Sequence, residues 1–190
     1  VQSNFELTVR SFLKENLRGL RRAMGAVKFQ KQQLKQMKRE GTVAACRLDS
    51  RTILEKGLYY YQGNDFASEL VYCLGRLCEP CLEHVDNNFS PLDETQKLEF
   101  SDVAEDIIYL IQSCRLRVSS NSYGEIDEEI KKATKLLNQL DTLKQKELQR
   151  IQDKIGSIKV SMVYLTMIQE ALNIVNYTIN LLKVSRKFQE

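Results

Sequence analysis

The chain has 190 residues, of which 43% are hydrophobic and 28% charged, with a formal net charge of +3. This composition excludes a disordered chain, and the lack of an uninterrupted apolar run of about eighteen residues argues against a membrane span. Since two prolines and eight glycines leave long stretches free for helix, we expect one all-α domain over residues 1–190, an antiparallel bundle of about five long helices.

The charge is distributed unevenly along the chain. The first forty residues hold ten Lys or Arg against three acids, whereas the other 150 hold eighteen against twenty-two. Because the cations recur at helical spacing beside an apolar row, we expect the first helix to pack with one face and to present the other to an anionic partner. A solvated face of an ordinary helix is the alternative. The residues concerned are Arg10, Lys14, Arg18, Arg21, Lys28, Lys31, Lys35 and Lys38.

The first two helices are expected over residues 3–39 and 49–85. Ser3 has the spacing of a capping box with the glutamate three residues later, and Gly41 is expected to end the first helix. Asp49 or the serine after it should open the second helix, in which Pro80 should kink the last turn or two. The apolar face predicted for the second helix consists of Ile53, Leu54, Leu58, Tyr61, Phe66, Leu70, Cys73, Leu74, Leu77 and Cys81.

Three further helices are expected in the second half of the chain. Ser90 as N-cap, with Pro91 at the first helical position, opens a helix that ends before the loop at residues 119–122. Residues 125–154 follow, with a bundle seam of Ile126, Ile130, Ala133, Leu137 and Leu140. The last helix, over residues 158–187, is apolar nearly all round, which predicts the central position in the bundle.

Cys78, Cys81 and His84 are spaced so that they share one edge of a helix. A zinc or redox site is one interpretation, but one histidine and two thiols leave a tetrahedral site short of a ligand. Buried small side chains beside Pro80 are the favoured interpretation. The odd number of cysteines, five, is typical of a reducing compartment, so we expect a cytosolic domain without a cofactor.

The acid pairs and motifs of the sequence do not predict a reaction. Asp65 and Glu69 share a helix face, and Glu105 precedes Asp106, but such acid pairs are common on solvated helix faces. The sequence has neither a Gly-rich phosphate loop nor a nucleophile elbow, and the basic helix lacks the interleaved aromatics of a nucleic-acid binder. We therefore expect a protein that is not an enzyme and does not bind nucleic acid.

Two segments resemble a known family. Residues 60–62 (YYQ), 79–80 (EP) and 83–88 (EHVDNN) resemble the cytosolic C-terminal region of bacterial sodium/phosphate cotransporter family proteins. Residues 164–168 (YLTMI) and 178–183 (TINLLK) are similar to the closing helix of that region. The region is PhoU-like, with the helical bundle of the phosphate-uptake regulator, and the resemblance extends in element order over nearly the whole chain.

The resemblance implies a non-catalytic regulatory or scaffolding domain of a sodium-dependent phosphate transporter, at the cytoplasmic face of the inner membrane. Its partner would be the membrane portion of the same chain, and an anionic lipid surface or a signalling protein would be further partners. The start at Val1 without methionine agrees with a fragment of a longer protein. The alternative is a soluble PhoU-like adaptor that signals to a separate protein; the oligomeric state stays open.

One departure from the family concerns metal. PhoU proteins carry a Glu-x-x-x-Asp signature whose carboxylates hold a multinuclear metal cluster. The matching positions here are Leu172 and Asn176, and the pair in the first half of the chain falls near Ser68 and Tyr72. Because these side chains are poor ligands compared with carboxylates, the resemblance does not carry the metal cluster over to this chain.

Overall fold

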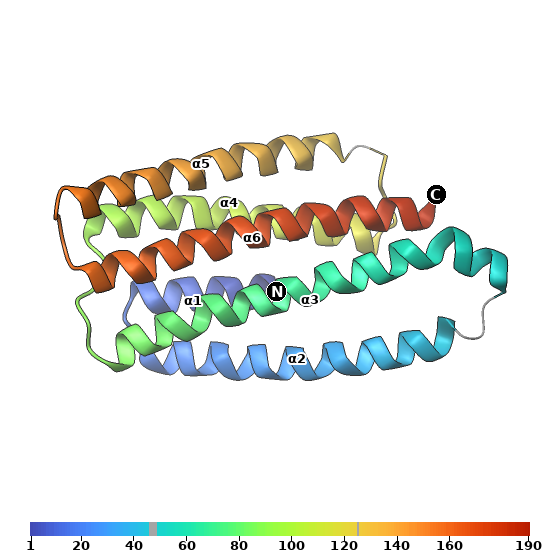
Figure 1. Ribbon diagram of the computed structural model, residues 1–190, viewed down its shortest axis with the longest axis horizontal. Helices are drawn as coiled ribbons and strands as arrows, with labels where there is room; N and C mark the ends of the chain where they lie inside the picture. The colour runs from blue at the N-terminus through green and yellow to red at the C-terminus, as the bar shows by residue number, and fades with distance from the viewer. Residues whose placement is uncertain (46–48, 125) are drawn as a thin grey trace.

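The computed structural model describes residues 1–45, 49–124 and 126–190 (Figure 1). These residues form an elongated all-α bundle in which successive helices run antiparallel, so the predicted fold class is confirmed. The expected number of about five helices is too low, because the described residues form six. They are α1 (Gln2–Leu13), α2 (Leu17–Ala45), α3 (Ser50–Asp86), α4 (Glu94–Ser119), α5 (Asp127–Gln152) and α6 (Ile158–Gln189).

The helix predicted over residues 3–39 is in fact the hairpin of α1 and α2. Glu15 adopts the left-handed conformation (φ 51°), and the Asn16 side chain accepts a hydrogen bond from the Gly19 backbone N–H at 3.0 Å, which caps α2. A Cβ at Gly19 would overlap the Ser11 hydroxyl, so glycine permits the close approach of α1 to α2. The three-residue break therefore has a local cause in Glu15, Asn16 and Gly19.

Two predicted helix ends at the N-terminal side of the chain are wrong. Ser3 is not a cap, since α1 begins at Gln2 with Val1 as its N-cap residue. Gly41 does not end a helix, because α2 continues through it to Ala45. A Cβ at Gly41 would overlap the Tyr60 hydroxyl of α3, so this glycine serves the packing of α2 against α3.

The start of α3 is as predicted, and the start of α4 is not. The Asp49 carboxylate accepts hydrogen bonds from the backbone N–H groups of Arg51 and Thr52, and α3 continues past Pro80 to Asp86. The N-cap of α4 is Asp93, which forms a reciprocal capping box with Gln96, and not Ser90. The reciprocal pair satisfies two backbone N–H groups, whereas a Ser90 cap would satisfy one.

The predicted central position of the last helix is confirmed. α6 packs against α3, α4 and α5, and fifteen of its residues are buried. Within the described ranges it is the one helix long and apolar enough to span a membrane, but 61% of the relevant window is buried inside the bundle. A core helix meets the same criterion, so the apolar character of α6 is explained by its packing.

The apolar face predicted for the second helix is buried over its second half alone. The interior of α3 begins at Ser68 and includes Leu70, Leu74 and Leu77, whereas Leu54 is 83% exposed and Leu58 61% exposed. Ile53 and Tyr61 are exposed as well. In the described part of the chain no residue of α2 beyond Val27 is classed as buried, so the far ends of α2 and α3 form a hairpin that extends past the main core (Figure 1).

Candidate functional site

The predicted cations of the first helix form a surface that extends over the α1–α2 hairpin. Within the described residues α2 packs against α1 and α3 and no other helix, so its remaining faces are open to solvent. Seven of the eight cations are exposed, and Lys38 is half-buried. We call the following eight residues the basic surface: Arg10, Lys14, Arg18, Arg21, Lys28, Lys31, Lys35 and Lys38.

Half of the basic surface is engaged in contacts with nearby side chains. These contacts involve mostly exposed groups, so each contributes little to stability, about 0 to 1 kcal/mol for an ion pair. They nevertheless reduce the charge that is available to a partner. The four contacts are Arg10 with Glu6 at 3.0 Å, Arg21 with Asp86 at 3.0 Å, Lys38 with Asp65 at 3.5 Å, and Lys31 over the ring of Tyr72 at 5.4 Å.

Three cations of α2 form a solvent-facing row. Lys28, Lys35 and Arg39 are seven and four residues apart, which places them on one face of the helix. All three are exposed, and none forms an ion pair with a carboxylate in the part of the chain that the structure describes. We call these residues the free row. Arg39 was not among the residues that the spacing argument selected.

Cys78, Cys81 and His84 do lie along one edge of α3, but they point into the core. Both thiols are fully buried, and the Cys78 thiol donates a hydrogen bond to the Leu20 carbonyl oxygen, with 3.6 Å between sulfur and oxygen. Burial raises the pKa of both thiols. The His84 Nε2 lies 2.8 Å from the Ser90 carbonyl oxygen, and its ring packs edge-on against Phe12 and Phe89. A ligand role would therefore require the core to open.

We predict that the buried thiols are inert in the folded protein. Burial and the nearby Glu170 raise the pKa of Cys73 to about 12, and burial with Glu129 does the same for Cys114. At pH 8 roughly one in ten thousand of these two thiols is ionised, so reaction with Ellman's reagent should be very slow. The variant Cys46→Ser removes the cysteine outside the described residues. In this background, unfolding by guanidinium should allow all four remaining thiols to react with Ellman's reagent.

The outcome that contradicts this prediction is rapid reaction of Cys78 and Cys81 in the native protein, together with about one equivalent of zinc by elemental analysis. That result would restore the metal interpretation of Cys78, Cys81 and His84. Over the described residues, no group of three or more His, Cys, Asp or Glu side chains is placed to hold a metal ion. The absence of a cofactor itself stays a prediction.

The four positions that the resemblance aligns with the PhoU metal signature have other surroundings in the structure. Leu172 is buried in the core, and Asn176 on the next turn of α6 is exposed. The Ser68 hydroxyl donates a hydrogen bond to the Asn64 carbonyl oxygen at 2.6 Å, and the ring of Tyr72 lies under Lys31. The predicted acid pair Glu105 and Asp106 is exposed on α4, as expected for a solvated face.

Three buried carboxylates were missed by the sequence argument. Each pairs with an arginine, which offsets the cost of its desolvation. Glu129 and Glu147 lie at the two ends of the α5 seam, in heptad spacing with the apolar residues between them, but the sequence argument selected an overlapping register that leaves both of them out. The pairs are Glu129 with Arg117 at 2.7 Å, Glu147 with Arg150 at 3.1 Å and Glu170 with Arg76 at 3.0 Å. The observed seam is Glu129, Ala133, Leu136, Leu140, Leu143 and Glu147.

The Glu147 pair is part of a polar network that joins α4 and α5. The Gln96 side chain donates a hydrogen bond to the Glu147 carboxylate at 2.9 Å, and Arg150 also lies 3.8 Å from Glu99. Burial, together with the Glu99 carboxylate, raises the pKa of Tyr164. Because this network is enclosed between packed helices, it fixes their register and offers no open surface for a substrate.

The fold and its surfaces define the class of this protein as an all-α helical bundle with a cationic hairpin. Comparisons of the chain with protein-family models, with curated proteins and with solved structures find no match.

Proposed function

We propose that this chain is a non-catalytic regulatory or scaffolding domain of a sodium-dependent phosphate transporter, held at the cytoplasmic face of the inner membrane. The family resemblance of residues 60–88 and 164–183 supports the transporter class. The observation that carries the proposal is the free row of Lys28, Lys35 and Arg39, exposed on a helix that packs on one side. Such a row suits an anionic surface larger than a small molecule.

The mechanism rests on charge at the surface and not on chemistry in the core. Cations close to an anionic leaflet gain about 1 kcal/mol each, and the attraction decreases when salt shortens the Debye length to about 3 Å at 1 M. The buried apolar side chains of α2, such as Leu20 and Val27, are committed to the bundle and cannot insert into lipid. Binding should therefore be weak, reversible and sensitive to ionic strength.

We predict that the free row mediates binding to anionic membranes. In co-sedimentation at low salt, the chain should bind vesicles that contain phosphatidylglycerol and should not bind vesicles of phosphatidylcholine alone. The triple variant Lys28→Gln, Lys35→Gln, Arg39→Gln should lose most of this binding, because each neutralised residue removes about 1 kcal/mol of attraction. All three side chains are exposed, so the fold should tolerate their replacement.

The matched control removes the same charge from elsewhere on the bundle. Lys131 and Lys135 on α5 and Lys154 after it are exposed and without an ion pair among the described residues. Their triple replacement by Gln should leave most of the binding intact. Equal sedimentation of the two triple variants, or no binding of the unaltered chain, would remove the membrane explanation and favour an acidic protein partner.

A soluble PhoU-like adaptor is the second candidate function. The exposed apolar side chains at the far end of the α2–α3 hairpin favour it, since Val43, Leu54 and Leu58 are 56%, 83% and 61% exposed. Exposed apolar groups of this kind suit a protein partner better than a lipid headgroup. The coding sequence upstream of Val1 separates the two candidates, because several apolar helices there would support the transporter and a short polar leader the adaptor.

A further inference from the structure

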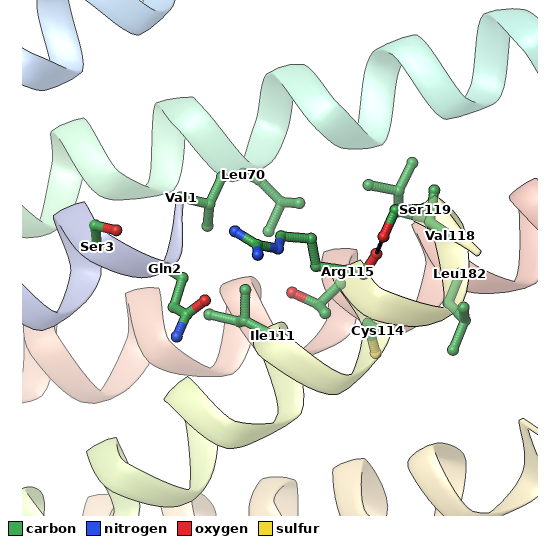
Figure 2. Close-up of a pocket in the computed structure, with 12 residues that line it drawn as sticks. Val1, Gln2, Ser3, Leu70, Ile111, Cys114, Arg115, Val118, Ser119 and Leu182 are labelled. Carbon is green, nitrogen blue, oxygen red and sulfur yellow. Dashed lines mark hydrogen bonds between the residues drawn. The ribbon is translucent and has the colours of Figure 1, made fainter.

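A cavity of about 380 Å³ lies between the start of α1 and the helices α3, α4 and α6 (Figure 2). Most of its wall is apolar, and its volume falls within the range that proteins use for small-molecule ligands. Gln2 and Ser3 at the start of α1 belong to its lining. The apolar wall consists of Leu70, Ile111, Cys114, Val118, Leu181 and Leu182.

Besides the Val1 amino group, whose pKa is lowered by burial and by the nearby Arg115 charge, the main polar feature of the cavity is the guanidinium of Arg115. This side chain is exposed, and Figure 2 shows it extending from α4 across the cavity toward Val1 and Leu70. In the described ranges no carboxylate pairs with Arg115. Thr178 of α6 adds a hydroxyl to the wall; this side chain is 5% exposed, and its oxygen has no hydrogen-bond partner in the described part of the protein.

We propose that this cavity binds a single-chain amphiphile with a carboxylate head, of the class of medium-chain fatty acids. The aliphatic tail would replace water along the apolar wall, which contributes about 25 cal/mol for each Å² buried. The carboxylate would meet the planar, permanently charged guanidinium of Arg115, whose paired N–H donors match its two oxygens. A compact polar anion such as phosphate would leave most of the apolar wall in contact with water. An uncharged chain would leave the Arg115 guanidinium without an anionic partner.

The cavity shares no residue with the basic surface, so the inference is tested separately from the proposed transporter, on the chain that begins at Val1. In isothermal titration calorimetry we expect decanoate, below its micelle concentration, to bind with one site per chain. Decanol should bind about tenfold more weakly, because it lacks the charge, and acetate and inorganic phosphate should not bind measurably. A charge-assisted hydrogen bond of modest strength accounts for a factor of about ten.

Three variants locate the site. Arg115→Gln should weaken decanoate binding about tenfold and leave decanol unchanged, whereas Arg22→Gln, which removes an exposed arginine from α2, should change neither. Val118→Phe adds volume to the wall from a position that is 36% exposed and should abolish binding while the circular dichroism spectrum is preserved. Absence of decanoate binding to the unaltered chain, or equal affinities of the Arg115→Gln and Arg22→Gln variants, would overturn the proposal.

Discussion

Replacing Ile168 with Asp should destabilise the protein by about 4 kcal/mol or more, a large share of the roughly 5 to 15 kcal/mol that stabilises a typical domain. Ile168 is completely buried in the first half of α6, where it belongs to the main hydrophobic core. Aspartate there would lose the apolar contacts and would place a carboxylate in a site built for a hydrocarbon side chain. Urea unfolding followed by far-UV circular dichroism measures the change.

The control for this experiment lies six residues earlier on the same helix. Met162 is 59% exposed, so Met162→Asp keeps the new carboxylate in water and should change stability by less than about 0.5 kcal/mol. Both variants place aspartate in the same helix, so the low helix propensity of aspartate contributes to both. Similar unfolding midpoints for Ile168→Asp and Met162→Asp would show that α6 is not the central helix.

Replacing Arg117 with Met should cost about 3 to 5 kcal/mol at pH 7, because the partner carboxylate would remain buried without its cation. Glu129 is 2% exposed and accepts hydrogen bonds from Arg117 Nε and from Ser113 Oγ, each at 2.7 Å. Methionine preserves most of the apolar stem of arginine, so the loss reports the charge and not the packing. Chemical unfolding again provides the measurement.

The pH dependence of this loss gives a second measurement. Burial opposes ionisation of Glu129, but the hydrogen bonds from Arg117 and Ser113 outweigh it, so the pKa of this carboxyl is lowered in the folded protein. Its contribution to stability is therefore present above the unfolded value of about 4.3 and is lost as the pH falls through the folded pKa. In Arg117→Met the unpaired carboxyl can take up a proton, so the deficit should shrink between pH 7 and pH 4.

A surface pair provides the control for the Arg117 experiment. Arg21 and Asp86 lie 3.0 Å apart, as closely as many buried pairs, but their side chains are 62% and 51% exposed. Arg21→Met should therefore cost less than about 1 kcal/mol. A Glu129→Leu change introduced together with Arg117→Met should recover much of the loss. If the two arginine variants lose the same stability, the Glu129 pair is not buried as the structure has it.

The sequence predicted the start of a helix correctly where the signal for that start lies within a few residues of it. The acid at position 49 and the apolar run from residue 158 located the starts of α3 and α6, because a capping side chain and an apolar periodicity act within a few residues. The break near Asn16 had a local signal too, but its neighbours form helix readily, and the close contact of Gly19 with Ser11 belongs to the packed hairpin.

Burial along a helix depended on which neighbours were present. Leu54 and Leu70 occupy the same predicted apolar face of α3, yet the first is exposed and the second is in the core, because the bundle ends between them. The α5 seam shows the same limit: the residues from Ile126 to Leu140 fit one heptad register, whereas the packed seam uses the register that begins at Glu129. Periodicity alone cannot distinguish two overlapping registers.

The residues of the basic surface were predictable from the sequence, whereas their contacts with other side chains were not. The sequence by itself determined the all-α class, the central place of the last helix and the excess of cations in the first forty residues, since these depend on composition and on periodicity along a single helix. Tertiary structure decided which cations pair with distant acids, where glutamates are buried beside arginines, and how four helices line the cavity near Arg115. These features depend on contacts between residues far apart in the chain, which no local pattern encodes.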